Sequence, residues 1–524
     1  MRKLISAACC CVMLSVSAQN TSIDVTHYGL KIHLNDTSNR ISVTEQIEFS
    51  WIDTSQLVQF DLESTQSNGK GMLVSSVFDQ SKSISYKQVG ELLILDDLKA
   101  AGRKQISLVI NYAGIPSDGL VISANKYGER TFFGDNWPNR AHLWFACNDH
   151  PSDKATISYS VTAPKYYEVI ANGEQLNRID INEHEATTSF SSNIVLPTKV
   201  MVIGVANFDS KKVANPLSPI EISLWVYPQN SEKSFYDLEL AKDIFNYYIS
   251  WIGPYEYEKL ANVQSTTRFG GMENAGCIFY DENAFNGRRT SESLIAHEIA
   301  HQWFGNSASE SDWQHIWLSE GFATYFTDLY LEQKYGTERM QKQLAKERAD
   351  VIQFYRQYPH PIVDSTYENL MDLLNENSYQ KGAWVLHMLR NRIGDELFHQ
   401  SIVAYYEKFR LSNATSQDFI QVVQEVTQQD LSVFFNEWLF QSGHPQLKIG
   451  KKIKGKSIKL SIQQVQKEHF TDIPITVEIT FEDGSKLQEQ FKLTGKTNVY
   501  NFKYSKKISQ ILIDPNVQLL FEEK

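Results

Sequence analysis

The sequence predicts a multidomain α+β protein with an N-terminal antiparallel β domain, a helix-rich middle domain and a small C-terminal β-sandwich. A chain of 524 residues is too long for one compact domain, and typical domain sizes suggest about three. The hydrophobic pattern changes period twice, from about two to about 3.6 and back again. We place the domains at residues 19–208, 209–445 and 446–524.

The N-terminal domain is predicted from runs of alternating apolar and polar residues. Tyr28, Leu30, Ile32 and Leu34 alternate with Gly29, Lys31 and His33, and similar runs recur around residues 47–51 and 106–112. Such runs, separated by turns rich in Asn, Asp, Gly and Ser, are typical of half-buried antiparallel strands. No helical run of convincing length interrupts them up to residue 208.

The middle domain carries long helical patterns. We expect helices at 233–251, 291–304, 318–335, 336–354, 381–393, 395–409 and 431–439. The pattern ends near Gly443-His444-Pro445, and the alternation returns at residues 458–462 and 475–481. This pattern predicts a small β-sandwich at residues 446–524.

Composition excludes two classes of protein. Hydrophobic residues make up 42% and charged residues 21%, which is ordinary for a globular protein and excludes a disordered chain. The net charge of −12 argues against a nucleic-acid binder, which needs basic surface to displace counterions from phosphates.

The first 18 residues predict a signal peptide. Arg2 and Lys3 precede an apolar run from Leu4 to Val16, and Val16-Ser17-Ala18 offers the small residues that a signal peptidase requires. We expect cleavage after Ala18 and a protein that is exported to the periplasm or secreted. Acylation at one of Cys9, Cys10 or Cys11 is the alternative, but the residues before Cys9 lack the large aliphatic side chain that such a signal uses.

The rest of the chain predicts no transmembrane segment and no disulfide framework. No later segment has 18 consecutive apolar residues. Only Cys147 and Cys277 lie beyond the signal segment. They could form one disulfide, but buried free thiols are commoner at this density.

The segment His297-Glu298-Ile299-Ala300-His301 lies in a predicted helix and carries the sharpest chemical signal. Positions i and i+4 share a helix face, so both imidazoles can reach one metal ion. Glu298 lies about 100° around the helix axis, beside the metal, which suits a general base for a metal-activated water. The alternative is a helix that only stacks these side chains on its surface.

A third candidate ligand follows in the next predicted helix. Eighteen residues separate His301 from Glu320, which opens a stretch of mostly apolar residues. A carboxylate buried there is costly unless it is paired or metal-bound. His297, His301 and Glu320 therefore form a two-His, one-Glu set, which leaves an open position on a catalytic zinc. The alternative is a carboxylate that only stabilises the helix N-terminus.

Two further segments have weaker local signals. In Gly270-Gly271-Met272-Glu273-Asn274 the two glycines allow a substrate strand to approach the backbone, and Glu273 could pair with an α-ammonium. A glycine turn with an exposed Glu is the alternative. Tyr379, before an apolar helix, could donate to a developing oxyanion, although a lone Tyr more often serves packing.

Together these motifs resemble the M1 family of zinc aminopeptidases (gluzincins). The matching segments are GGMEN at 270–274, HEIAHQWFG at 297–305, WLSEGFA at 317–323 and Tyr379 with Lys381-Gly382, in the family's order and spacing. The GGMEN form resembles the branch that contains leukotriene A4 hydrolase and aminopeptidase B. The resemblance covers the chain beyond the signal segment and implies a thermolysin-like catalytic domain at 209–445.

The resemblance implies a role for each matching residue. It implies that His297, His301 and Glu320 bind one Zn²⁺ per chain, that Glu298 is the general base and that Tyr379 stabilises the tetrahedral intermediate. Glu273 would bind the substrate's free amine. The implied substrates are peptides with a free N-terminus. The substrate-binding segment comprises Gly270, Gly271, Met272, Glu273 and Asn274.

The sequence departs from the family pattern at three places. Ser319 stands where Asn commonly precedes the ligand Glu, which affects one outer-shell hydrogen bond. The C-terminal helical domain of many members has no counterpart in the sequence. The residue with which the N-terminal domain helps to anchor the amine is not evident, and Asp135 and Asn136 are the candidates.

The sequence thus predicts an exported zinc aminopeptidase. An epoxide hydrolase or an endopeptidase on the same scaffold is the alternative enzyme. A zinc-binding protein without catalysis is the alternative outside enzymes, and it predicts the loss of Glu298 or Tyr379, both of which are present.

Overall fold

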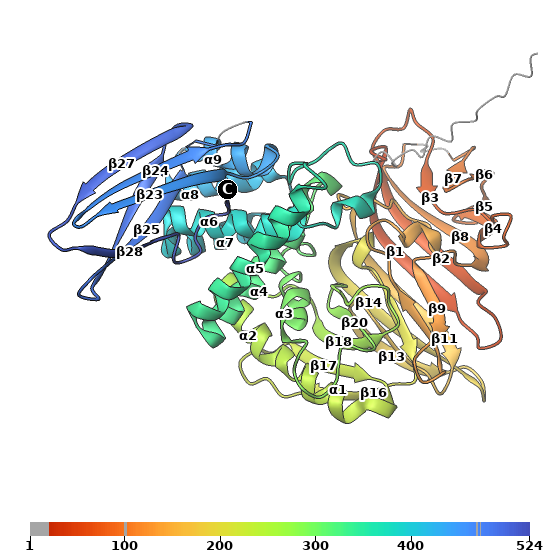
Figure 1. Cartoon of the computed structure of the whole chain (residues 1–524). Helices are drawn as coiled ribbons and strands as arrows, with labels where there is room; N and C mark the ends of the chain where they lie inside the picture. The colour runs from red at the N-terminus through yellow and green to blue at the C-terminus, as the bar shows by residue number, and fades with distance from the viewer. Residues whose placement is uncertain (1–19, 99–101, 468–469, 472) are drawn as a thin grey trace, which may run out of the picture.

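The computed structural model describes residues 20–98, 102–467, 470–471 and 473–524, and it contains three regions along the chain (Figure 1). The predicted signal segment lies outside the described residues. A β-rich N-terminal region, a central region with most of the helices and a C-terminal β region follow one another, which confirms the predicted fold class. No helix in the described ranges is long and apolar enough to cross a membrane.

The N-terminal region is built on an eight-stranded sheet in the order β13-β14-β11-β1-β2-β8-β4-β5. Its strands are antiparallel except for β1 and β11, which run parallel. The predicted alternation is present, since Tyr28, Leu30 and Ile32 are buried in β1. The strands of this sheet are β1 (Ile23–His33), β2 (Ile41–Trp51), β4 (Gly71–Asp79), β5 (Lys82–Ser83), β8 (Gln105–Ile115), β11 (Lys154–Pro164), β13 (Glu174–Asp180) and β14 (Glu185–Pro197).

Two smaller sheets complete this region, in the orders β12-β15-β10-β9 and β3-β7-β6. Their strands are β3 (Gln59–Asp61), β6 (Tyr86–Val89), β7 (Leu92–Leu95), β9 (Leu120–Ala124), β10 (Arg130–Gly134), β12 (Glu168–Ala171) and β15 (Ile203–Ala206). The apolar core of the region includes Cys147 and extends to Cys277 in the central region. Both thiols are buried and free, so they do not form the disulfide that we considered.

The central region combines a five-stranded sheet, in the order β16-β17-β18-β20-β19, with helices. The edge strand β19 pairs only with β20, so its other edge is open to a further strand. The strands are β16 (Asp209–Val213), β17 (Glu221–Val226), β18 (Lys259–Ser265), β19 (Gly271–Met272) and β20 (Cys277–Asp281), with a separate pair of β21 (Ala308–Glu310) and β22 (Ser412–Ala414).

The helices follow the predicted pattern with some differences. The segment expected at 233–251 is divided at Glu239 into α1 and α2, and α8 was missed by the periodicity although Thr415 and Asp418 form a capping box at its start. The helices are α1 (Ser231–Leu238), α2 (Leu240–Ile252), α3 (Glu292–Ala300), α4 (Trp317–Tyr335), α5 (Thr337–Tyr355), α6 (Gly382–Ile393), α7 (Asp395–Phe409), α8 (Ser416–Thr427) and α9 (Ser432–Phe435).

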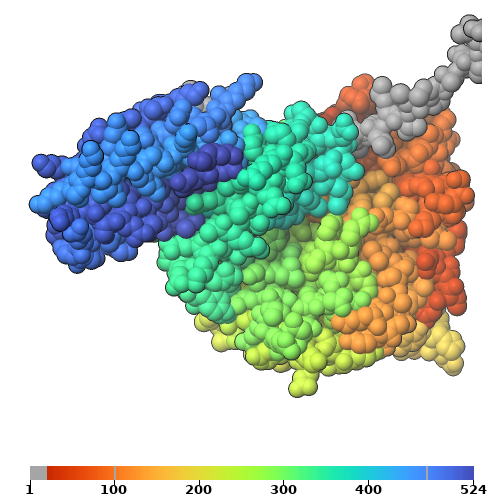
Figure 2. All heavy atoms as spheres, in the orientation of Figure 1, coloured from red at the N-terminus to blue at the C-terminus, as the bar shows by residue number. Residues whose placement is uncertain are grey.

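The C-terminal region is a two-sheet sandwich, as predicted, with strand orders β27-β24-β23-β29 and β26-β25-β28. It extends from the helical side of the central region, away from the N-terminal region (Figure 2). Its apolar core is continuous with that of the central helices. The strands are β23 (Gln446–Lys454), β24 (Ser457–Gln464), β25 (Ile473–Phe481), β26 (Lys486–Leu493), β27 (Thr497–Lys503), β28 (Ile508–Ile513) and β29 (Glu522–Glu523).

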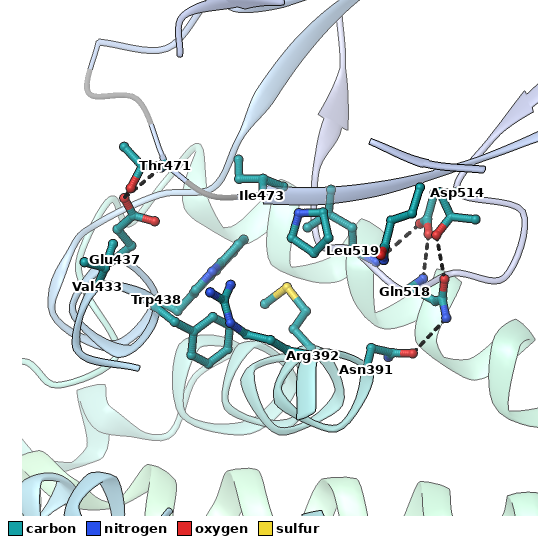
Figure 3. Close-up of a pocket in the computed structure, with 15 residues that line it drawn as sticks. Asn391, Arg392, Val433, Glu437, Trp438, Thr471, Ile473, Asp514, Gln518 and Leu519 are labelled. Carbon is teal, nitrogen blue, oxygen red and sulfur yellow. Dashed lines mark hydrogen bonds between the residues drawn. The ribbon is translucent and has the colours of Figure 1, made fainter. Parts of the chain in front are cut away.

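A pocket marks the junction between the central helices and this sandwich (Figure 3). Polar contacts border it on both sides. The Glu437 carboxylate accepts hydrogen bonds from the backbone N and the hydroxyl of Thr471, each at 2.7 Å, and Gln518 donates to Asn391 at 2.8 Å. None of the candidate catalytic residues lines this pocket.

The junction predicts a stability effect. Arg348 in α5 donates to the buried Asp514 at 2.6 Å and also lies over the rings of Trp384 and Phe521. Because Arg348→Met leaves a buried carboxylate without its cation, we expect a loss of about 3 kcal/mol in the free energy of unfolding, measured by urea denaturation.

The matched control is Lys342→Met, on the same helix. Lys342 forms an exposed ion pair with Glu338, so this substitution should change stability by less than about 1 kcal/mol. Equal stability of Arg348→Met and the control would contradict the importance of the Arg348–Asp514 pair.

Candidate active site

Helix α3 brings the two predicted histidine ligands together. His297 lies in its last turn and His301 follows directly as its C-cap, so one turn separates them. Their Nε2 atoms are 3.0 Å apart. Both imidazoles therefore direct the same ring nitrogen toward one point.

Helix α4 supplies Glu320 in its first turn, as predicted. Glu320 Oε2 lies 3.4 Å from His297 Nε2 and 3.2 Å from His301 Nε2. Around a tetrahedral Zn²⁺ with bonds of 2.0–2.2 Å, two donor atoms are separated by about 3.3–3.6 Å. The three donor atoms thus form a triangle of nearly the size that zinc requires.

The donor atoms are also free to bind a cation. Glu320 Oε2 is buried and makes no hydrogen bond with any described residue. His301 Nδ1 lies 3.1 Å from the Phe304 carbonyl oxygen, which can only accept, so Nδ1 carries a proton and Nε2 is the ring nitrogen that faces the other donor atoms. The residues present therefore fit a zinc ion.

Ser319 provides the outer-shell contact that its replacement of Asn had put in doubt. Its hydroxyl oxygen lies 3.1 Å from His301 Nδ1 and shares that N–H with the Phe304 carbonyl. Gly305 makes room for this contact, because a Cβ there would lie 2.1 Å from Ser319 Oγ, and its φ of +108° is one that favours glycine.

Glu298 faces the edge strand β19 and is buried. A Cβ on Gly271 would lie 2.1 Å from Glu298 Oε1, so the second glycine of the segment leaves room for this carboxylate. Met272 packs in the N-terminal core, whereas the Asn274 amide is buried without a hydrogen bond to any described residue. The structure thus places the Glu298 carboxylate against β19 at Gly271.

Glu273 lies at the end of this edge strand and is only 5% exposed, which excludes the exposed glycine turn considered from the sequence. Carboxylate oxygens of Glu273 and Glu298 and a ring nitrogen of His301 lie within 4.8 Å of one another. A substrate strand that paired with β19 would therefore meet a carboxylate at its end.

Tyr379 lies in a π-helical turn, η6 (Asn377–Lys381), beside the histidines. Its ring is stacked against His297 at a centroid distance of 6.0 Å. The close approach of α4 and α6 places it there, since a Cβ on Gly321 would lie 2.9 Å from the Gly382 Cα. These contacts bring together six of the predicted residues from four separate segments, namely Glu273, His297, Glu298, His301, Glu320 and Tyr379.

Negative charge dominates the electrostatics. Burial raises the pKa of Glu298 well above its usual range; His301 opposes this shift, and Glu273 and Glu320 reinforce it. Burial alone would lower the pKa of His301, but Glu320 and Glu273 raise it to about 10. The group of carboxylates therefore favours a cation in its midst.

Burial, together with Glu320 and Glu273, also raises the pKa of Tyr379 well above its usual value. The phenol therefore keeps its proton at neutral pH. It can donate a hydrogen bond to a substrate oxygen, which is what an oxyanion stabiliser requires.

Asp135 and Asn136, the candidates for amine binding in the N-terminal region, are engaged in hydrogen bonds within the protein. Both carboxylate oxygens of Asp135 already accept hydrogen bonds, from Arg140 at 2.6 Å and from the backbone N of Arg268 at 3.2 Å. The Asn136 amide donates to two backbone carbonyls and accepts from Trp144. Asp135 thus contacts the segment just before Gly270, whereas Asn136 holds residues 198–201.

Two buried lysines near the site were not found from the sequence. Lys199 pairs with Glu310, and its charge opposes the rise in the pKa of Glu273. Lys154 donates to backbone carbonyls of the loop after α3. Neither could be found from the sequence, because a lone Lys gives no signal of its partners.

Comparison with protein families agrees with this geometry. Residues 24–200 match the peptidase M1 N-terminal domain and residues 236–438 match the peptidase family M1 domain. The fold and the site thus define a peptidase with the HExxH motif, in which Glu320 of the following helix is the third candidate ligand. The chain belongs to peptidase family M1.

Individual relatives are more distant. The chain is 28% identical to human glutamyl aminopeptidase over 331 residues, which cover 60% of this chain and 34% of that protein. It is 24% identical over 479 residues to a probable aminopeptidase of Sulfurisphaera tokodaii. This match covers 87% of this chain and 59% of that protein. The chain thus matches about a third to three fifths of the length of these relatives.

A crystal structure of Legionella pneumophila aminopeptidase A in complex with aspartic acid has a similar fold. The TM-score is 0.81 at 16% identity, and the match covers 96% of this chain and 60% of that one. The similarity supports the arrangement of all three regions.

The triangle of donor atoms predicts which variants lose metal. Glu320→Ala should weaken zinc binding by more than the roughly 10- to 100-fold that the loss of an outer-shell contact costs, because it removes a ligand. Glu298→Ala should keep about one zinc per chain, because Glu298 is not a ligand, and should still lose nearly all activity.

Zinc retained after dialysis against a graded chelator, measured by elemental analysis, checks both variants. Full zinc content in Glu320→Ala, or zinc loss in Glu298→Ala, would contradict the assignment of ligands.

Proposed function

We propose that the protein is a zinc-dependent aminopeptidase that removes N-terminal residues from peptides. The observation that supports this proposal most is the position of Glu273. An open edge strand ends at a buried carboxylate, directly beside a triangle of zinc-ligating atoms. A peptide strand paired with β19 would end where its free α-ammonium could pair with Glu273.

His297, His301 and Glu320 would hold the zinc ion. When bound, Zn²⁺ would polarise the scissile carbonyl and lower the pKa of a water molecule. Glu298, which lies beside this position, takes a proton from the attacking water and passes it to the leaving amine.

Tyr379 donates its phenolic proton in a hydrogen bond to the oxygen that becomes negatively charged. The backbone of Gly270 and Gly271 pairs with the substrate strand, and the absence of side chains lets that strand approach closely. Glu273, with Glu320 nearby, holds the α-ammonium and fixes the scissile bond one residue from the N-terminus.

The apolar segment at residues 1–18 supports export to the periplasm or the cell exterior as part of the proposal. The sequences at the site give no support to the epoxide hydrolase alternative. An endopeptidase would not need a carboxylate at the end of the edge strand β19. A non-catalytic zinc protein would not need Glu298 and Tyr379.

Discrimination between a free and a blocked amine tests the proposal. The wild-type protein should cleave a peptide with a free N-terminus and leave its N-acetylated form intact. Glu273→Ala should reduce kcat/KM for the free peptide by roughly 30- to 1000-fold, equivalent to the ~2–4 kcal/mol lost when a buried charge pair is truncated. Zinc content should not change.

The control is Glu221→Ala, a partly exposed Glu on β17 of the same sheet, which should behave as wild type. Equal cleavage of the free and acetylated peptides by the wild-type protein would replace the aminopeptidase proposal with an endopeptidase.

A further inference from the structure

The Glu273 carboxylate receives little support of its own. Its Oε1 atom is buried and has no hydrogen-bond partner among the described residues. Glu298 and Glu320 repel it, whereas His301 and Lys199 attract it. Because no donor directs Oε1, contacts to the backbone that carries Glu273 contribute to its position.

Two side-chain amides hold that backbone from the side of the metal helix. The carbonyl oxygen of Glu273 accepts from Gln302 Nε2 at 2.8 Å and from Asn306 Nδ2 at 2.6 Å. Gln302 Oε1 also accepts from the backbone N of Gly276 at 2.8 Å. Gln302 thus spans the segment 273–276 with both ends of one amide.

Both amide residues are rigidly placed relative to the metal. Gln302 is 1% exposed and follows His301 directly, and Asn306 is 0% exposed in the loop that follows. A change in their position would move Glu273 and the histidines relative to each other. The two amides therefore fix the distance between the carboxylate and the metal site.

A third amide holds the same segment from the N-terminal region. Asn172 Nδ2 donates to the carbonyl oxygens of Ala275 and Val200, each at 2.8 Å, and Asn172 Oδ1 accepts from the backbone N of Val202 at 2.6 Å. The segment after Glu273 is therefore held from both sides.

Lys154 supports the loop that carries Asn306. Its Nζ donates to the carbonyl oxygens of Asn306, Ser307 and Ser412, at 3.2, 2.7 and 2.8 Å. Lys154 begins β11 of the N-terminal region, so this region supports the Glu273 backbone by two independent routes.

We propose that Gln302 and Asn306 form an amide clamp on the Glu273 carbonyl that positions its carboxylate for the substrate's α-ammonium. They are positioning residues and do not touch the substrate. Gln302 uses both ends of its amide and Asn306 uses its amino group in these contacts, and a displacement of about 1 Å in an active site can cost 10²-fold. The inference rests on the proposed aminopeptidase function.

The test compares two zinc-binding inhibitors, an amino-acid hydroxamate and its analogue without the α-amine. Both bind through the hydroxamate, and only the first can use Glu273. In the wild-type enzyme the amine should strengthen inhibition. In Gln302→Met the ratio of the two inhibition constants should fall by about 10- to 100-fold, while the analogue inhibits as before.

The same variant should keep its zinc and its thermal unfolding midpoint to within a few degrees. Asn306→Ser provides a second test with the same readout, and it decides the question if Gln302→Met does not fold. Gln400→Met, at an exposed position of α7, is the matched control and should keep the wild-type ratio.

The outcomes separate the clamp from the function on which it rests. If the wild-type enzyme binds both hydroxamates equally, the proposed amine site is wrong. If the wild type prefers the amine and the folded clamp variants keep that preference, the clamp is wrong. A uniform loss of affinity for both inhibitors would show that the amides serve only stability, and would also overturn the inference.

Discussion

Three carboxylates, those of Glu273, Glu298 and Glu320, lie buried around one pair of imidazoles, and the cost of burying their charge constrains the rest of the structure. Burial of like charges is tolerable only if a cation or protons compensate them. The geometry provides for a cation, since three donor atoms form a triangle with sides of 3.0–3.4 Å. Glu298 and Glu273 lie outside this triangle, where we propose that they serve proton transfer and the binding of an ammonium group.

The scaffold meets this constraint by combining elements that are far apart in the sequence. Helix α3 and its C-cap supply the histidines, α4 supplies Glu320, and the edge strand β19 leads to Glu273. Close contacts at glycines, such as Gly321 against Gly382, bring these elements near enough to act on one substrate atom. The N-terminal region contributes no proposed catalytic group, but Asn172 and Lys154 hold the backbone around the site, so the domains work as one unit.

The sequence predicted those parts of the site whose chemistry depends on local spacing. The i, i+4 histidines follow from helix geometry alone, and Glu320 follows from the cost of a buried carboxylate. Contacts across domains could not be predicted, because a Gln or a Lys has no periodic signature that identifies a distant partner. For the same reason Asp135 and Asn136 were considered for amine binding, although Arg140 and backbone groups occupy them. The π-helical turn at Tyr379 also has no period that the sequence reveals.

The most direct measurement is a crystal structure of the zinc-loaded protein with a bound amino acid, with anomalous scattering recorded at the zinc edge. The account predicts one strong peak bonded to His297 Nε2, His301 Nε2 and Glu320, at about 2.0–2.2 Å from each. It also predicts that the amino group of the bound amino acid lies within hydrogen-bond distance of the Glu273 carboxylate. Zinc at another position, or an amino group directed away from Glu273, would contradict the account.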